Sequence, residues 1–155
     1  METTNTRHIL AVDPGKATGL ALFCRVGSEE PELLMSSEVD FRGYVSTIRS
    51  VFSEHPNVEV VCEKFTINVQ TAKKSQAPFS LECIGALKVI MLDNGLEPDS
   101  LRYQLPANAM SMFTNEKLKT LEYWHRGGEG HALDAIRHGL LYLATSGWVP
   151  RRLLG

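Results

Sequence analysis

Two apolar runs, each ending on an acidic residue, constrain the fold of this chain most strongly. ILAV, residues 9–12, leads into Asp13, and VEVVC, residues 58–62, leads into Glu63. Both runs are rich in apolar and β-branched residues, which predicts strands buried inside a sheet. If the two strands are central and adjacent, the two carboxylates lie close together at one edge of the sheet.

The residues around Asp13 predict a hairpin. A strand at about 8–13 is followed by a tight turn at Pro14-Gly15 and by a second strand at about 18–26. An aspartate before Pro-Gly is more often a turn former than a catalytic group. Asp13 taken alone therefore says little about function.

The rest of the chain alternates between strand and helix patterns. The predicted elements are a strand at 32–39, a helix at 41–54, a strand at 58–63, a helix at about 80–94, a strand at 101–105, a helix at 114–124 and a helix at about 131–145. This order predicts an α/β fold in which helices flank a mixed sheet. The helix at 80–94 is apolar on almost all sides, so we expect it to be buried in the domain or between subunits.

Length and composition predict an ordinary globular protein. The chain has 155 residues, of which 43% are hydrophobic and 22% charged, and we expect residues 1–155 to form a single domain. No apolar stretch resembles a leader or a membrane span, which predicts a cytoplasmic location. The three cysteines form no C-x-x-C pair, which argues against a disulfide framework or a thiolate zinc site.

The net charge of −2 provides no global electrostatic signature of a nucleic-acid-binding protein. This is weak evidence against a nucleic-acid partner. A protein that holds metal ions with clustered carboxylates can be acidic overall, because the ions supply the positive charge that faces a phosphate.

The segment GHALDAIRHGLLYL adds a third candidate group to the two strand-end acids. His131 and Asp134 are three residues apart and share one face of the predicted helix, and His138 extends that face. A stripe of small residues suits close packing on the sheet, and a stripe of larger apolar residues lies beside it. The small residues are Ala132, Ala135 and Gly139, and the apolar ones are Leu133, Ile136, Leu140 and Leu143.

Each of these polar residues also has an ordinary interpretation. Glu63 could pair with a neighbouring lysine at the surface. Asp134 could be a favourable anion in the first turn of a helix, and His131 a solvated residue near the helix start. Taken singly, these interpretations are more common than a ligand role, and sequence spacing leaves open whether the side chains meet.

Taken together, the four residues would form an oxygen-rich site. Three acids and one histidine suit hard divalent cations, so the expected ion is Mg²⁺ or Mn²⁺ and not zinc. A site with two such ions can activate a water and stabilise the leaving oxygen of a phosphodiester.

Three motifs in this order resemble the RuvC-type Holliday junction resolvases of the RNase H-like superfamily. They are Asp13-Pro14-Gly15 with Gly19, then Glu63 in VVCEKF, then His131 with Asp134 in HALDA. The agreement in order and spacing covers nearly the whole chain.

The resemblance implies an RNase H-like fold with a five-stranded mixed sheet, and a homodimer that cuts branched DNA symmetrically with two Mg²⁺ per active site. Carried over to this chain, Asp13 would bridge both ions, and Glu63 and Asp134 would complete their shells. His131 would be a ligand or a proton-handling neighbour of the attacking water, and some relatives have aspartate there. The helix at 80–94 is where the resemblance puts the dimer interface.

Several further residues are candidates for DNA contacts. Phe65 could stack on a base at an open junction centre, or be a core residue. The lysines could contact phosphates, or be solvated. They are Lys64, Lys73 and Lys74 after the central strand, and Lys117 and Lys119 before the glycine-rich loop.

The segment at 106–120 is less basic and has fewer glycines than in typical resolvases, so flaps and forks are substrates to consider beside four-way junctions. One alternative is another RNase H-like nuclease, similar to those that process pre-ribosomal RNA. Another is a module that binds branched DNA without cutting it. Glu63 and the H-x-x-D pattern favour the resolvase, and clustered carboxylates without metal would hinder phosphate binding.

Overall fold

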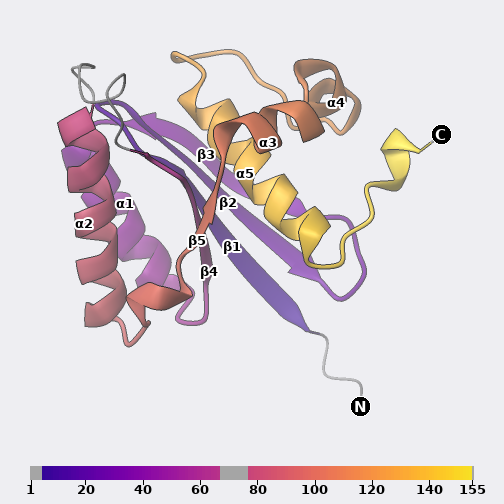
Figure 1. Cartoon of the computed structure of the whole chain (residues 1–155). Helices are drawn as coiled ribbons and strands as arrows, with labels where there is room; N and C mark the ends of the chain where they lie inside the picture. The colour runs from indigo at the N-terminus through magenta and orange to yellow at the C-terminus, as the bar shows by residue number, and fades with distance from the viewer. Residues whose placement is uncertain (1–4, 67–76, 155) are drawn as a thin grey trace.

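The two apolar runs that end on acids form neighbouring central strands. The computed structural model describes residues 5–66 and 77–154 (Figure 1). In it, β1 (Thr6–Asp13) and β4 (Glu59–Glu63) pair in parallel, and Val12 and Cys62 are partners in the ladder. Asp13 follows Val12 and Glu63 follows Cys62, so both carboxylates lie at the same end of this strand pair.

Three more strands complete a five-stranded mixed sheet in the order β3-β2-β1-β4-β5. The antiparallel hairpin partner of β1 is β2 (Thr18–Val26), which also pairs antiparallel with β3 (Glu32–Val39). The two edge strands of the sheet are β3 and β5 (Arg102–Gln104), and β5 runs parallel to β4. The predicted mixed α/β sheet is confirmed.

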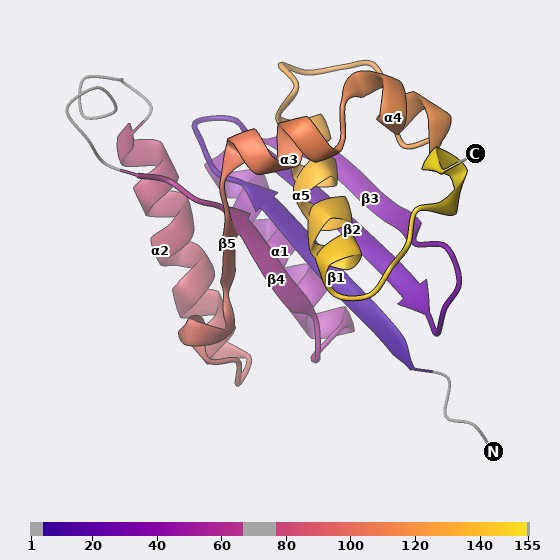
Figure 2. The same ribbon diagram turned by 45° about the vertical axis from the view of Figure 1, so that its right-hand side comes forward.

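Helices cover both faces of the sheet (Figures 1 and 2). One face packs on α1 (Phe41–Glu54) and α2 (Ala77–Asp93), and the other on α5 (His131–Thr145). The remaining helical segments are α3 (Pro106–Met112), α4 (Asn115–Thr120) and two short turns, η2 (Pro98–Ser100) and η3 (Arg151–Leu153). The alternating side chains of β1 and β2 thus enter two separate apolar cores.

The small-residue stripe of α5 allows this helix to lie close to the sheet, as predicted. Ala132, Ala135 and Gly139 are buried, and a Cβ at Gly139 would lie 2.6 Å from the ring of Phe23. Ile136, Leu140 and Leu143 fill the core beside them, whereas Leu133 is only partly buried. The close approach holds the first turn of α5 over the ends of β1 and β4.

The predicted helix at 114–124 differs from the structure in two respects: a separate helix precedes it, and it ends earlier. Pro106 ends the preceding strand but also begins α3, because proline suits the first position of a helix. The next helix ends at Thr120 and not at Trp124, since Glu122 has a positive φ of 66° and Tyr123 turns in to pack edge-on against Phe23.

Two other expectations can be compared with the described residues. Cys62 and Cys83 are buried, Cys24 is half-buried, and all three are free thiols. In residues 5–66 and 77–154, no helix combines the length and apolar character that crossing a membrane requires.

Candidate active site

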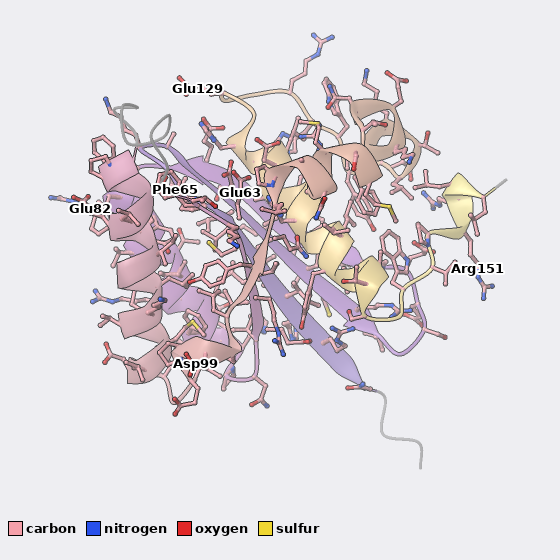
Figure 3. All side chains as sticks on the ribbon, in the orientation of Figure 1. Glu63, Phe65, Glu82, Asp99, Glu129 and Arg151 are labelled. Atoms are coloured by element: carbon pink, nitrogen blue, oxygen red, sulfur yellow. The ribbon has the colours of Figure 1, made fainter. Side chains whose placement is uncertain are left out.

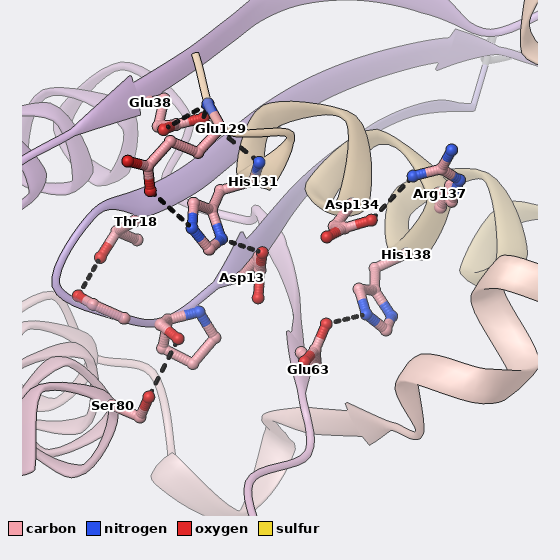
Figure 4. A network of polar contacts seen from close by, with 12 residues as sticks. Asp13, Thr18, Glu38, Glu63, Ser80, Glu129, His131, Asp134, Arg137 and His138 are labelled. Carbon is pink, nitrogen blue, oxygen red and sulfur yellow. Dashed lines mark hydrogen bonds and ion pairs between the residues drawn. The ribbon is translucent and has the colours of Figure 1, made fainter. Parts of the chain in front are cut away.

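Asp13 lies at the end of β1 and is only 5% exposed, so it is not a solvated turn residue. Its Oδ2 is 3.0 Å from Nδ1 of His131 (Figure 4). Burial raises the pKa of Asp13 to about 6, and the hydrogen bond from His131 opposes that shift. The turn after it is fixed by Thr18, whose hydroxyl donates to the carbonyl of Gly15. A buried carboxylate thus has a rigid support on a central strand.

His131 is the first residue of α5 and pairs with Asp13. The hydrogen bond to Asp13 raises the pKa of His131 from its ordinary value of 6.5 to about 9, although burial acts in the other direction. The other ring nitrogen, Nε2, is 3.8 Å from the Glu129 carboxylate. The contacts with the two carboxylates therefore favour the protonated form of the His131 ring.

Asp134 lies one turn further along α5 and is held by Arg137. Nη1 of Arg137 donates to Asp134 Oδ1 at 2.7 Å, and Nε donates to the carbonyl of Phe113 at 2.8 Å. Nη2 donates to Oδ1 of Asn115. Burial raises the pKa of Asp134, and the guanidinium opposes this. Because Arg137 is only 4% exposed, it fixes Asp134 relative to the junction of α3 and α4.

Glu63, at the end of β4, has a histidine as its hydrogen-bond partner among the described residues. Its Oε2 lies 2.9 Å from Nε2 of the buried His138. Glu63, Asp134, Arg137 and His138 line an open pocket of about 260 Å³, together with residues of α3 that include Met110. The carboxylate therefore faces the other acids across a space that opens to solvent (Figure 4).

Three of the four predicted residues form a compact set of potential metal ligands. One ligand atom each from Asp13, His131 and Asp134 lie within 4.8 Å of one another. Glu63 stands outside this tight group but faces it from the adjacent strand (Figure 4). Carboxylate oxygens with one imidazole suit a hard divalent cation, so the residues present fit Mg²⁺ or Mn²⁺.

Glu38 on β3 supports the site and was missed by the sequence analysis. Its carboxylate accepts the backbone N–H of Glu129, at 2.9 and 3.0 Å, and that of His131 at 3.2 Å. The N-cap residue of α5, Gly130, has no side chain to do this. Gly128 permits the approach, because a Cβ there would lie 2.4 Å from Glu38 Oε2. The available signal in the sequence was the position of Glu38 near the end of a predicted strand, as for Asp13.

The predicted DNA-contact residues differ in placement. Lys64 is exposed and Phe65 half-buried, and both directly follow Glu63 in the chain. Figure 3 labels Glu63 and Phe65. Lys117 donates to the carbonyl of Met112, and Lys119 lies over the ring of Trp124, so neither joins the acidic group within the described residues. The predictions for Lys73 and Lys74 fall outside the described residues.

Comparison with known proteins shows similarity in structure. No protein-family model and no curated protein sequence matches the chain. The structure of T. thermophilus RuvC in complex with a Holliday junction substrate superposes with a TM-score of 0.68 at 16% identity, covering 90% of this chain and 96% of that one. A second Thermus thermophilus RuvC structure matches with the same TM-score and coverage at 15% identity. The chain therefore has the RNase H-like fold of RuvC, as its motifs predict.

Proposed function

We propose that this chain is a metal-dependent endonuclease that cuts Holliday junctions and other branched DNA during recombination, repair or the processing of replication intermediates. The observation that carries the proposal is the convergence of Asp13, Glu63, His131 and Asp134, from β1, β4 and α5, at one end of a RuvC-like sheet. The bound Holliday junction in one matching RuvC structure supports branched DNA as the substrate class. We propose that residues 1–155 act as one nuclease domain.

Asp13, His131 and Asp134, with Glu63 beside them, are the residues that would hold the metal. Two Mg²⁺ ions, or Mn²⁺ in their place, would supply an activated water and stabilisation of the leaving oxygen in phosphodiester hydrolysis. Asp13 holds its carboxylate at the centre of the site from a rigid strand. Arg137 keeps Asp134 in place, and the hydrogen bond from Nδ1 of His131 keeps the Asp13 carboxylate oriented.

Two residues beside the acids are proposed contacts for DNA. Lys64 is exposed immediately after Glu63, where its ammonium group can reach a phosphate near the cleavage point. Phe65 follows and retains partial exposure, as stacking on a base requires.

The proposal is tested by incubating the protein with an end-labelled four-way junction in Mg²⁺, in Mn²⁺ and in EDTA. We expect paired nicks, symmetric about the branch point, with either metal and none in EDTA. Glu63→Gln should still bind the junction but not cut it. Cleavage in EDTA, or by Glu63→Gln at the wild-type rate, would contradict the metal site. Binding by the wild type with no cleavage in either metal would favour a non-cutting module.

Metal activation should depend on pH through His131. Imidazole ligates only when neutral, and the pKa of His131 is raised to about 9, so ligation of a metal ion by this ring would require the loss of its proton at any lower pH. We expect the Mg²⁺ concentration for half-maximal cleavage to fall as pH rises from 7 to 9, by up to about tenfold per unit. In metal-free protein, the stabilisation from this proton is complete below pH 6.5 and is lost as pH rises through about 9.

The control for this prediction is His131→Asp, which replaces the imidazole by a group that is ionised across the whole range. Its half-maximal Mg²⁺ concentration should vary much less between pH 7 and 9. Cleavage rates at several Mg²⁺ concentrations and three pH values give the half-maximal Mg²⁺ concentration of both proteins. An equal half-maximal concentration at all pH values for the wild type would contradict the ligand role of His131.

We further propose a homodimer that meets along α2. Leu81, Val89 and Leu92 are 46%, 57% and 56% exposed, and with the exposed Gly85 they follow one face of the helix at spacings of four, four and three residues. Such a stripe is typical of helices that pack against a partner.

Val89→Glu should therefore separate the subunits. Light scattering should give twice the chain mass of 17.2 kDa for the wild type at micromolar concentration, and the single mass for the variant. Paired nicks should then become single nicks. Leu34→Glu on β3, where the leucine is 44% exposed, provides a control that should remain dimeric. A monomeric wild type would refute the dimer.

A further inference from the structure

His138 is a buried titratable residue that the proposed mechanism does not use. It lies on α5 one turn after Asp134 and is only 1% exposed. Both of its ring nitrogens have partners. Nε2 is 2.9 Å from Glu63 Oε2 at the end of β4, and Nδ1 is 2.9 Å from the side-chain amide of Gln104 at the end of β5. The imidazole thus joins two strand ends to the helix that carries Asp134.

Gln104 determines which ring nitrogen carries the hydrogen. With its NH₂ group toward the helix, the amide donates to Nδ1 of His138 at 2.9 Å and to the carbonyl oxygen of His138 at 3.0 Å. Its oxygen then accepts the backbone N–H of Tyr142 at 3.2 Å. This orientation is the one that gives the amide oxygen a donor and the amide nitrogen acceptors. Because Nδ1 accepts, the ring hydrogen is on Nε2, which donates to Glu63.

We infer that His138, oriented by Gln104, is a positioning residue that holds one carboxylate oxygen of Glu63 and leaves the other oxygen directed to the metal site. The inference rests on the proposed function and deepens it. Outer hydrogen bonds of this kind orient ligating carboxylates in metal sites and preserve their affinity for the ion. Without the bond, Glu63, whose side chain is 25% exposed, can rotate toward solvent.

Tyr142 provides a matched case in which a similar bond has no connection to the site. It follows His138 by one turn of α5, and its hydroxyl donates to Glu59 Oε1 at 2.8 Å. Glu59 is also a glutamate of β4, but it lies at the opposite end of the strand and pairs with Arg7. Tyr142→Phe therefore removes a bond between α5 and β4 and measures the purely structural effect of such a loss.

Two substitutions of His138 test the hydrogen bonds of its two ring nitrogens separately. In His138→Gln the amide nitrogen reaches about as far as Nε2, so the donor to Glu63 is kept. In His138→Asn the amide reaches only about as far as Nδ1, so the contact with Gln104 is kept and the bond to Glu63 is lost. Both replacements are polar, but asparagine is one methylene smaller than glutamine and leaves a small cavity, so the unfolding measurement is needed to record that cost separately.

The test is Mn²⁺ binding to the full chain without DNA, followed by the paramagnetic resonance of free Mn²⁺, with thermal unfolding measured on the metal-free variants. We expect His138→Asn to weaken binding at least tenfold. The Mn²⁺ affinities of His138→Gln and Tyr142→Phe should stay within about threefold of the wild-type affinity, which is well below the loss expected for His138→Asn. Adding His138→Asn to Glu63→Gln should cause no further loss, because the bond acts through Glu63.

If His138→Asn binds Mn²⁺ as tightly as the wild type does, the inference is wrong, and the proposed function is not affected. The same holds if both His138 variants lose affinity in proportion to their loss of thermal stability, as a structural role predicts. Absence of Mn²⁺ binding by the wild type would overturn the proposed metal site and the inference together. Nitrogen NMR of the imidazole in the wild type is independent of any variant's folding, and a hydrogen on Nδ1 in place of Nε2 would refute the inference.

Discussion

Asp13→Asn should reduce junction cleavage by at least about 1,000-fold, because a metal-centred site contributes several kcal/mol of charge stabilisation to the reaction. Asp13 is the most buried of the four candidate residues and the one that contacts His131. An amide at this position keeps the size of the side chain but removes the charge that the cation requires. Binding to the four-way junction should remain, since the substitution lowers the negative charge that faces the phosphates.

The measurement is single-turnover cleavage with Mg²⁺, beside a binding assay in EDTA. Asp99→Asn is the matched control, because Asp99 is an exposed aspartate on η2 and its substitution should leave cleavage unchanged (Figure 3). If Asp13→Asn cuts at a rate near that of the wild type, Asp13 is a turn residue and the assignment of the site fails.

Gly19→Ala should cost about 3 kcal/mol of unfolding free energy or more, the upper end of the range for overpacking a well-packed site. Gly19 is the partner of Asp13 in the β1–β2 register, and a Cβ there would lie 1.9 Å from the carbonyl oxygen of His131. Because that neighbour is backbone, no side-chain rotation relieves the overlap. The first turn of α5 must move away, and the contact between His131 and Asp13 should be lost with it.

Urea unfolding measures this effect, and Ser46→Ala is the comparison. Ser46 is exposed on α1, away from the proposed site and the α2 interface, so alanine there should leave stability unchanged or raise it by up to about 0.5 kcal/mol. Equal stabilities for the two alanine variants would show that the start of α5 does not depend on the close approach at Gly19.

The parts of the site that could be predicted are those that the chain encodes locally. A buried run that ends on an acid is visible at residues 9–13 and 58–63, and parallel pairing of two such strands brings Asp13 and Glu63 together without further information. The bounds of α5 were predicted correctly as His131–Thr145 because its small and apolar stripes repeat with helical spacing over four turns.

The supporting residues could not be predicted, because each acts on a residue far away in the sequence. Glu38 caps a helix that begins more than ninety residues later, and His138 reaches Glu63 across 75 positions. Their charge and polarity are visible in the sequence, but the partner depends on which strand passes beneath α5. Helix α3 was missed for another reason, since Pro106 is compatible both with the end of a strand and with the start of a helix.

The most direct test of the central claim is the rate of cleavage of four substrates by the wild-type protein in Mg²⁺. A four-way junction, a flap, a fork and a linear duplex of the same sequence and length should be compared at equal concentration. We expect paired symmetric nicks in the junction, cleavage of the flap or fork at the branch point, and no cleavage of the duplex. Equal cutting of all four substrates would contradict a structure-selective nuclease.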